Sequence, residues 1–244
     1  MSKTKEEKYY CTSELLLGWY DLNKRKLPWR ALPGKLSNPY FVYLSGIMLQ
    51  QTIVRTVIPY FLKFIKKWPT IEELARADFK EISSYWAGLG YYSRAKYLHE
   101  TAKIISKKYN GFVPDDKNIL LSFPGVGNYT ASAIMAIAFN NKCNVVDGNV
   151  ERIFSRLYAV EEPIEISKKN INDLAEKHLP NYRHGDYAQS LMDLGSLVCK
   201  SKSPRCSICP IINFCKVGGT FASTEYPKRL PKKIRKIDMV CFFV

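Results

Sequence analysis

The sequence is short of acidic residues. Asp and Glu together number 22 against 37 Lys and Arg, which gives a formal net charge of +15, and no Asp or Glu occurs between Asp21 and Glu72. A charge so far from zero favours a polyanionic partner, although charge alone does not separate DNA from RNA or from an acidic membrane. A soluble basic surface without such a partner is the alternative explanation.

The sequence also lacks segments that would direct it into or across a membrane. Its N-terminus, MSKTKEEKYY, is charged and has no apolar stretch of the kind found in secretory signals. The longest apolar run, at 131–139, is far shorter than the roughly 20 residues that span a bilayer. We therefore expect an intracellular protein without a membrane partner. Separate expectations are a monomer and a location in a bacterial cytosol or with the nucleoid. There its 7 cysteines should be thiols or metal ligands rather than disulfides.

Strand-like alternation is missing until the last residues, and no segment repeats at a fixed period. The sequence therefore predicts an all-α fold. Thr70 with Glu73, and Asp78 with Glu81, have the spacing of capping boxes that would open two consecutive short helices.

The C-terminal part of the chain differs in composition. Residues 216–236 are rich in Gly, Pro, Lys and Arg and predict a linker. Residues 237–244, IDMVCFFV, then read as an apolar strand. Because a lone exposed strand promotes aggregation, we expect this to be the first strand of a domain that is missing.

Four cysteines lie close together with the spacing C-x6-C-x2-C-x5-C: Cys199, Cys206, Cys209 and Cys215. Thiolates this close indicate a shared metal, which could be zinc or an iron–sulfur cluster. Structural zinc sites usually have two short Cys pairs, whereas this spacing has one. The spacing resembles the 4Fe-4S loop of the endonuclease III and adenine glycosylase families. A cluster here would also present Lys200, Lys202 and Arg205 to phosphates.

A glycine-containing turn precedes a helix at residues 123–134, FPGVGNYTASAI. Gly125 and Gly127, on either side of Val126, would let the backbone approach a phosphate, and the N–H groups at the start of the helix would bind the anion. Asp147 follows 20 residues after Gly127, between an apolar stretch and a new helix that it could simply cap. With the cysteine loop, these features resemble the helix-hairpin-helix DNA glycosylase superfamily.

Longer motifs narrow the resemblance. They are LPWR at 27–30, NPYFVYLS at 38–45, MLQQT at 48–52, WAGLGYYSRAK at 86–96 and DGNV at 147–150. They resemble the adenine DNA glycosylase family of MutY type, which removes adenine opposite guanine or 8-oxoguanine in double-stranded DNA. The resemblance implies a six-helix barrel at 29–137 and a 4Fe-4S cluster module at 1–28 and 138–217. Residues 218–244 would then be the linker and first strand of the missing domain, which recognises 8-oxoguanine.

The resemblance also implies roles for single residues. Asp147, supported by Asn149, would stabilise the oxocarbenium-like sugar that forms when the base leaves. Gln51 and Tyr91 would wedge into the base stack beside the flipped adenine. The remaining DNA-binding residues would be Gly125, Val126, Gly127, Arg94, Lys200, Lys202 and Arg205. Tyr129 replaces the lysine of the bifunctional relatives, so Schiff-base strand cleavage is not expected.

One residue departs from the family pattern S-E-x-M-L-Q-Q-T. The chain has Gly46 where the family has the glutamate that protonates adenine, and no neighbouring acid can replace it. We therefore expect adenine excision to be severely reduced. Two alternatives stay open: a thymine glycosylase at G·T mismatches, since those enzymes also carry a tyrosine at the Tyr129 position, or a protein that binds mismatches without excising a base.

Overall fold

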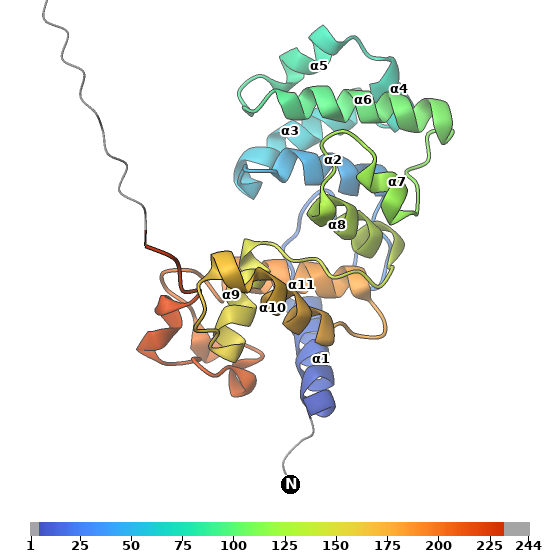
Figure 1. Ribbon diagram of the computed structural model, residues 1–244. Helices are drawn as coiled ribbons and strands as arrows, with labels where there is room; N and C mark the ends of the chain where they lie inside the picture. Colours follow the sequence, from blue (N-terminus) through green and yellow to red (C-terminus); the bar gives the residue numbers. More distant parts are fainter. Residues whose placement is uncertain (1–4, 232–244) are drawn as a thin grey trace, which may run out of the picture.

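The computed structural model describes residues 5–231, and the strand predicted at 237–244 lies outside them. Every regular element in the described range is helical, which confirms the predicted all-α class (Figure 1). The α-helices are α1 (Lys5–Asn23), α2 (Pro39–Leu49), α3 (Val54–Lys67), α4 (Ile71–Arg76), α5 (Phe79–Trp86), α6 (Ser93–Lys108), α7 (Lys117–Leu121), α8 (Asn128–Phe139), α9 (Gly148–Tyr158), α10 (Ile164–Lys177) and α11 (His184–Leu197). Three short 3-10 helices follow: η1 (Cys206–Ile208), η2 (Ile212–Phe214) and η3 (Phe221–Glu225).

The helices α2 to α8 enclose one hydrophobic core, in the upper part of Figure 1. The helix α3 shows why the sequence packs this way: Val57, Phe61 and Phe64 recur at helical spacing and are fully buried, while the lysines of its last turn stay outside. Trp86, at the end of α5, lies against Phe64 with their ring centroids 5.8 Å apart. The helix α2 packs against α3, α6 and α8, so it lies at the centre of this group.

Both predicted helix starts between α3 and α6 exist, but only one is a full capping box. At α4 the Glu73 N–H donates to Thr70 Oγ1 (3.3 Å), and the Thr70 N–H donates to Glu73 Oε2 (3.1 Å). At α5, Asp78 accepts from the Lys80 N–H (2.9 Å). Glu81 pairs with Lys67 (2.7 Å) instead of accepting from the Asp78 N–H. The predicted cap at Asp78 is therefore confirmed, and the predicted role of Glu81 is wrong.

A second hydrophobic core lies between α1, α9, α10 and α11, in the lower part of Figure 1. Leu16 and Leu17 of α1 pack there with Phe154 and Leu194, which come from the other end of the sequence. The chain therefore starts in this core, crosses to the first core over residues 24–38, and returns over residues 140–147. None of the helices in the range 5–231 has the length and apolar character to cross a bilayer.

The helix α11 joins the two groups because it packs on α1 and α9 and also on α8. At its start, a Cβ on Gly185 would lie 2.6 Å from the Ala136 carbonyl oxygen and 2.9 Å from the Ile137 Cα. Only glycine therefore lets the two helix backbones approach this closely.

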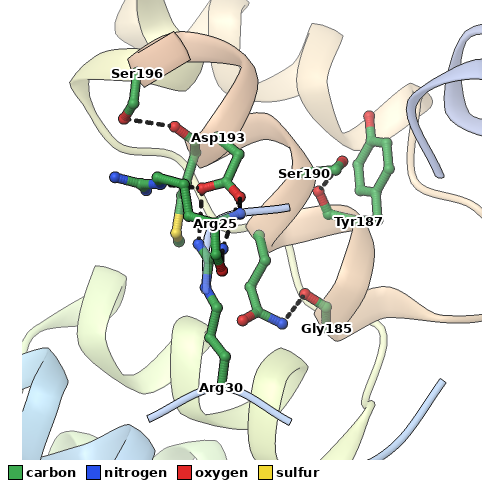
Figure 2. A network of polar contacts seen from close by, with 9 residues as sticks. Arg25, Arg30, Gly185, Tyr187, Ser190, Asp193 and Ser196 are labelled. Carbon is green, nitrogen blue, oxygen red and sulfur yellow. Dashed lines mark hydrogen bonds and ion pairs between the residues drawn. The ribbon is translucent and has the colours of Figure 1, made fainter. Parts of the chain in front are cut away.

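Further along α11, the carboxylate of Asp193 is fully buried between two arginines of the first crossing segment (Figure 2). Arg30 donates from both terminal nitrogens, at 2.7 and 2.9 Å, in a bidentate pair. Arg25 donates through its backbone N–H (2.9 Å) and its Nε (2.5 Å). Four donors on one carboxylate fasten residues 25–30 to α11 and so hold one group of helices against the other.

The segment predicted as a linker is packed over its described part. The Ile164 N–H donates to the Lys228 carbonyl (2.8 Å), and the Leu230 N–H donates to Glu165 Oε2 (3.2 Å). Tyr226 is buried, and its carbonyl accepts from Arg156 Nε (3.2 Å). Residues 226–230 therefore lie along α9 and α10 rather than forming a free tether.

The buried ion pair leads to a first prediction. Replacing Asp193 with Asn or Ala leaves two arginines facing each other without a buried counter-charge, which costs about 3–5 kcal/mol of the free energy of unfolding. Urea denaturation followed by circular dichroism measures this loss. Asp173→Asn, on the exposed face of α10, is the control and should change stability by less than about 0.5 kcal/mol. Equal stability of the Asp193 and Asp173 variants would contradict the role given to this pair.

Candidate active site and nucleic-acid interface

The carboxylate of Asp147 is held at the N-terminus of α9. Its Oδ1 accepts from the backbone N–H groups of Asn149 (2.8 Å) and Val150 (2.9 Å), and its Oδ2 accepts from the Asn149 side chain (2.9 Å). These three donors fix the direction of the carboxylate at the start of the helix. Asp147 is therefore a helix cap and, being only partly buried, also an anion open to a ligand.

The amide of Asn149 is fixed in turn by Arg152, one turn along α9. Arg152 Nη2 donates to Asn149 Oδ1 and to the Gly195 carbonyl, each at 2.8 Å, and Arg152 Nε donates to the Cys199 carbonyl (2.8 Å). One side chain thus ties the start of α9 to the end of α11 and to the first cysteine of the loop. Arg152 was not among the predicted site residues. Its position three residues after Asn149, one helical turn away, could have indicated this contact.

Tyr129 lies in the first turn of α8 and approaches Asp147 from the first group of helices. The residue is 39% exposed, yet its hydroxyl group loses contact with water. This desolvation first, and the negative charge of Asp147 second, raise the pKa of the phenol. The hydroxyl therefore stays protonated at neutral pH and can donate a hydrogen bond, but it cannot form a Schiff base. Tyr129 and Asp147 are thus close enough for the charge of Asp147 to affect the pKa of Tyr129.

Gly46 lies inside α2, on the side that faces α8. A Cβ built on it would meet only Thr130 Cγ2, at 3.8 Å, which is an ordinary van der Waals contact. Thr130 lies in the first turn of α8, so the position of the expected glutamate faces the start of that helix. The backbone at Gly46 therefore offers room for a side chain, and glycine is not required by packing.

The predicted hairpin turn joins α7 to α8. Gly125 has φ +75°, and a Cβ there would lie 2.9 Å from the Cβ of Tyr97, so glycine is required twice over. Gly127 caps α8 without a side chain, and no side chain caps the first-turn N–H groups of that helix. Those groups remain available to an anion such as a phosphate.

Val126 does not face outward as the predicted set of DNA-binding residues requires. Its side chain is buried, and its N–H already donates to the Phe123 carbonyl (3.1 Å). The residue stabilises the turn from inside. Gln50 supports the turn from outside, since its Nε2 donates to the Gly125 carbonyl (3.1 Å).

The two predicted wedge residues both have left-handed backbones. Gln51, just after α2, has φ 55°, and Tyr91, just before α6, has φ 47°. Such a conformation costs a residue with a Cβ about 1–2 kcal/mol, so the surrounding structure must impose it. Both side chains are exposed, Tyr91 to 60%. They project from two neighbouring loops, as strand-separating residues would need to.

Arg94 was predicted to contact DNA, but the structure places its side chain inside the protein. Its side chain is only 5% exposed, and both terminal nitrogens donate to backbone carbonyls at the ends of these loops. Burial lowers the pKa of this guanidinium from its ordinary value, and its Nε has no hydrogen-bond partner. The sequence could not show this, because the carbonyls that surround Arg94 include those of residues 47–50, far away in the chain.

The four cysteines follow α11 and surround η1 and η2. Burial, followed by the charges of the other three cysteines, raises the pKa of the Cys209 thiol to about 12. Arg156 Nη1 lies 3.4 Å from Cys199 Sγ and donates to the Lys200 carbonyl (2.7 Å), which orders the start of the loop. Among the described residues, no three His, Cys, Asp or Glu side chains are close enough to bind one metal ion. Lys200, Lys202 and Arg205 are exposed on the loop, as a phosphate contact would require.

Known proteins resemble this chain in sequence and in fold. The HhH-GPD superfamily of base excision DNA repair proteins matches residues 44–181. Among solved structures, a thermostable thymine-DNA glycosylase superposes with a TM-score of 0.77 at 27% identity, covering 88% of this chain and 98% of that one. An endonuclease III–DNA complex superposes with a TM-score of 0.69 at 23% identity, covering 88% and 96%.

The chain has the helix-hairpin-helix fold of DNA glycosylases. The hairpin before α8 and the capped aspartate at α9 agree with this class. The chain belongs to the HhH-GPD superfamily of base excision DNA repair proteins.

Within that superfamily, the predicted resemblance to adenine DNA glycosylases is confirmed. The chain is 39% identical to the adenine DNA glycosylase of Arabidopsis thaliana over 94% of its own length and 41% of the relative. It is 41% identical to that of Homo sapiens, over 82% of the chain and 38% of the relative. It is 38% identical to that of Buchnera aphidicola subsp. Baizongia pistaciae, over 83% of the chain and 57% of the relative. The chain thus spans about two fifths to three fifths of these relatives.

Two helical glycines give a prediction that tests the site geometry. Gly46→Ala should raise the free energy of unfolding by about 0.5–1 kcal/mol, since it removes the entropic cost of a helical glycine and meets no clash. Gly185→Ala should instead destabilise by about 1–3 kcal/mol, because its Cβ would overlap the backbone of α8. Thermal and urea unfolding of the two variants give the comparison. Destabilisation by Gly46→Ala would mean that the space beside Thr130 is not there.

Proposed function

We propose that this protein is a base-excision-repair glycosylase that hydrolyses the N-glycosidic bond of adenine mispaired with guanine or 8-oxoguanine, and that its activity is severely reduced. The observation that carries the proposal is the carboxylate of Asp147, held by three donors at the start of α9 and approached by Tyr129 from α8. The likeness to adenine DNA glycosylases supplies the substrate class.

The reaction needs an anion and an acid. As the bond between sugar and base breaks, its electron pair moves onto the adenine and positive charge builds up on the sugar, which Asp147 stabilises. A water then adds its oxygen to the sugar carbon and loses a proton. Adenine leaves readily only when one of its ring nitrogens accepts a proton, so a carboxylic acid is required on the other side of the base.

Gly46 occupies the position where the acid is expected, and it has nothing to donate. Tyr129 keeps its proton because its pKa is raised, so it is a much weaker acid than a carboxyl group. The anion is therefore in place and the acid is not. Tyr129 also stands where the bifunctional relatives have a lysine. The proposed enzyme is therefore monofunctional, without Schiff-base strand cleavage.

Double-stranded DNA is the proposed partner. The uncapped start of α8 would bind one phosphate, and the exposed Lys200, Lys202 and Arg205 would bind others. Gln51 and Tyr91 would enter the base stack and offset the cost of flipping the adenine. Because these contacts release counterions, the affinity should fall steeply as salt rises.

The cysteine loop fits a 4Fe-4S cluster. Burial first, and then the charges of neighbouring cysteines of the loop, raise the pKa of the Cys209 and Cys215 thiols, so the loop brings its cysteines near one another. Cys199, Cys206, Cys209 and Cys215 would hold the cluster. When bound, the cluster would cross-link the loop and so fix the three exposed cations.

A thymine glycosylase at G·T mismatches is the second candidate. It is favoured by the superposition on a thymine-DNA glycosylase and by a tyrosine at position 129. A protein that binds mismatches without excision is the third, and Gly46 is the residue that favours it.

Base release from three duplexes, with A opposite 8-oxoguanine, A opposite guanine and T opposite guanine, separates these candidates. Excess protein is incubated with each duplex, and abasic sites are cleaved with alkali. We expect slow adenine release by the natural chain, and Gly46→Glu should accelerate it by about 10²–10⁴-fold by restoring the acid. Gly46→Gln, of the same size but without an acidic proton, is the matched control and should not accelerate it. Asp147→Asn in the Gly46→Glu background should abolish release.

Other outcomes would contradict the proposal in distinct ways. If Gly46→Glu binds mismatched DNA but stays inert, the acid position is wrongly assigned. Release of thymine alone identifies the second candidate. Rapid adenine release by the natural chain would show that Gly46 does not impair it. Preferential binding of the mismatches without release by any variant identifies the third candidate.

Iron content tests the cluster. Protein purified without air should contain about four irons per chain and absorb in the visible range, and Cys209→Ser should lose both. Cys143→Ser is the control, because this thiol is outside the loop and should leave the iron content unchanged. Zinc in place of iron, or no metal in the natural chain, would contradict the cluster.

A further inference from the structure

The buried guanidinium of Arg94, on α6, is bonded to two separate loops. One terminal nitrogen donates to three carbonyls at the end of α2, and the other donates to two carbonyls before α6. These acceptors are Ile47 (3.3 Å), Met48 (2.7 Å), Gln50 (2.5 Å), Leu89 (3.2 Å) and Gly90 (3.1 Å). Each group of acceptors ends one residue before a wedge residue, at Gln50 before Gln51 and at Gly90 before Tyr91.

Aromatic rings complete the surroundings of this guanidinium. Its carbon lies 5.4 Å from the centroid of the Trp86 ring and 5.3 Å from that of Tyr91. Trp86 Nε1 also donates to the Gly90 carbonyl (2.9 Å), so this carbonyl has two donors. The side chain of one wedge residue therefore packs on the cation that orders its own loop, while Tyr91 remains 60% exposed.

Arg94 has no acidic partner among the ion pairs of residues 5–231. A buried cation is costly unless its donors are used, and here carbonyl dipoles use the donors of both terminal nitrogens. Both loops gain from this, because Gln51 and Tyr91 adopt left-handed backbones that their side chains disfavour. A planar fork of N–H groups can reach two loops at once, whereas the single ammonium of lysine cannot.

We propose that Arg94 is a positioning residue that locks the two DNA-separating residues, Gln51 and Tyr91, in one shared geometry before DNA binds. It does so without touching a phosphate. This inference rests on the proposed function for its consequence, the flipping of the base, but the lock itself is a property of the free protein.

The lock is tested without DNA by hydrogen exchange of the backbone amides. In Arg94→Lys and Arg94→Met, amides at 50–52 and 89–92 should exchange at least about tenfold faster, because both loops lose their common donor. Lys96→Met, on the exposed face of the same helix, removes a positive charge without a buried contact and should leave exchange unchanged. Amides in α9 and α10 report whether the variants are folded. Faster exchange in only one loop, or in neither, would overturn the lock.

The consequence is tested with duplexes that carry 2-aminopurine opposite guanine in place of the target adenine. At saturating protein, the fluorescence rise that reports flipping should fall about tenfold in Arg94→Lys and not in Lys96→Met. The slope of affinity against salt should not change in Arg94→Met, whereas loss of a phosphate contact would lower it by about one. A lower slope with flipping retained in Arg94→Met would make Arg94 a phosphate contact and overturn the proposal.

A double-mutant cycle shows whether Arg94 acts through the wedge residues. In a Gln51→Ala, Tyr91→Ala background, adding Arg94→Lys should reduce flipping no further, and a full additional loss would overturn the proposal. If the natural chain shows no fluorescence rise with any duplex, the proposed function fails. The exchange measurement then still decides whether Arg94 locks the loops.

Discussion

The arrangement of this molecule depends on the buried carboxylate of Asp193. Its two arginine partners belong to the segment that carries the chain from one hydrophobic core to the other. At the other end of α11, Gly185 allows close backbone contact with α8. One helix thus touches both groups at two places, which keeps α9, with Asp147, opposite α8, with Tyr129. The candidate site exists only because two separately packed groups of helices are held in this relation.

Arginines that cap carbonyls recur throughout the structure. Arg94 bonds to the loops that carry Gln51 and Tyr91, Arg152 joins α9 to α11, and Arg156 orders the start of the cysteine loop. Part of the net charge of +15 is therefore used inside the protein. A polyanionic partner would meet only the exposed cations, such as Lys200 and Lys202, and the uncapped start of α8. The net charge is therefore larger than the positive charge that a polyanionic partner could reach.

Much of the candidate site was predictable because its signals are local. Asp147 caps a helix through the two residues that follow it, and Gly125 makes a turn that needs a positive φ. Arg94 and Val126 were not predictable, since each lies in a motif that resembles a DNA-binding loop and yet points into the protein. The packing of residues 226–230 was also missed, because composition does not show which helices a Pro- and Lys-rich segment will meet.

The sequence by itself determined the helices, their caps, the helical class and the chemical groups of the site, including the glycine at position 46. These depend on residues within a turn of one another, or on the residue itself. Only the tertiary structure decided which cations are buried, how Tyr129 approaches Asp147 and which loops share a donor. Each of those depends on atoms from segments distant in the chain, and close packing in two cores is what brings them within hydrogen-bond distance.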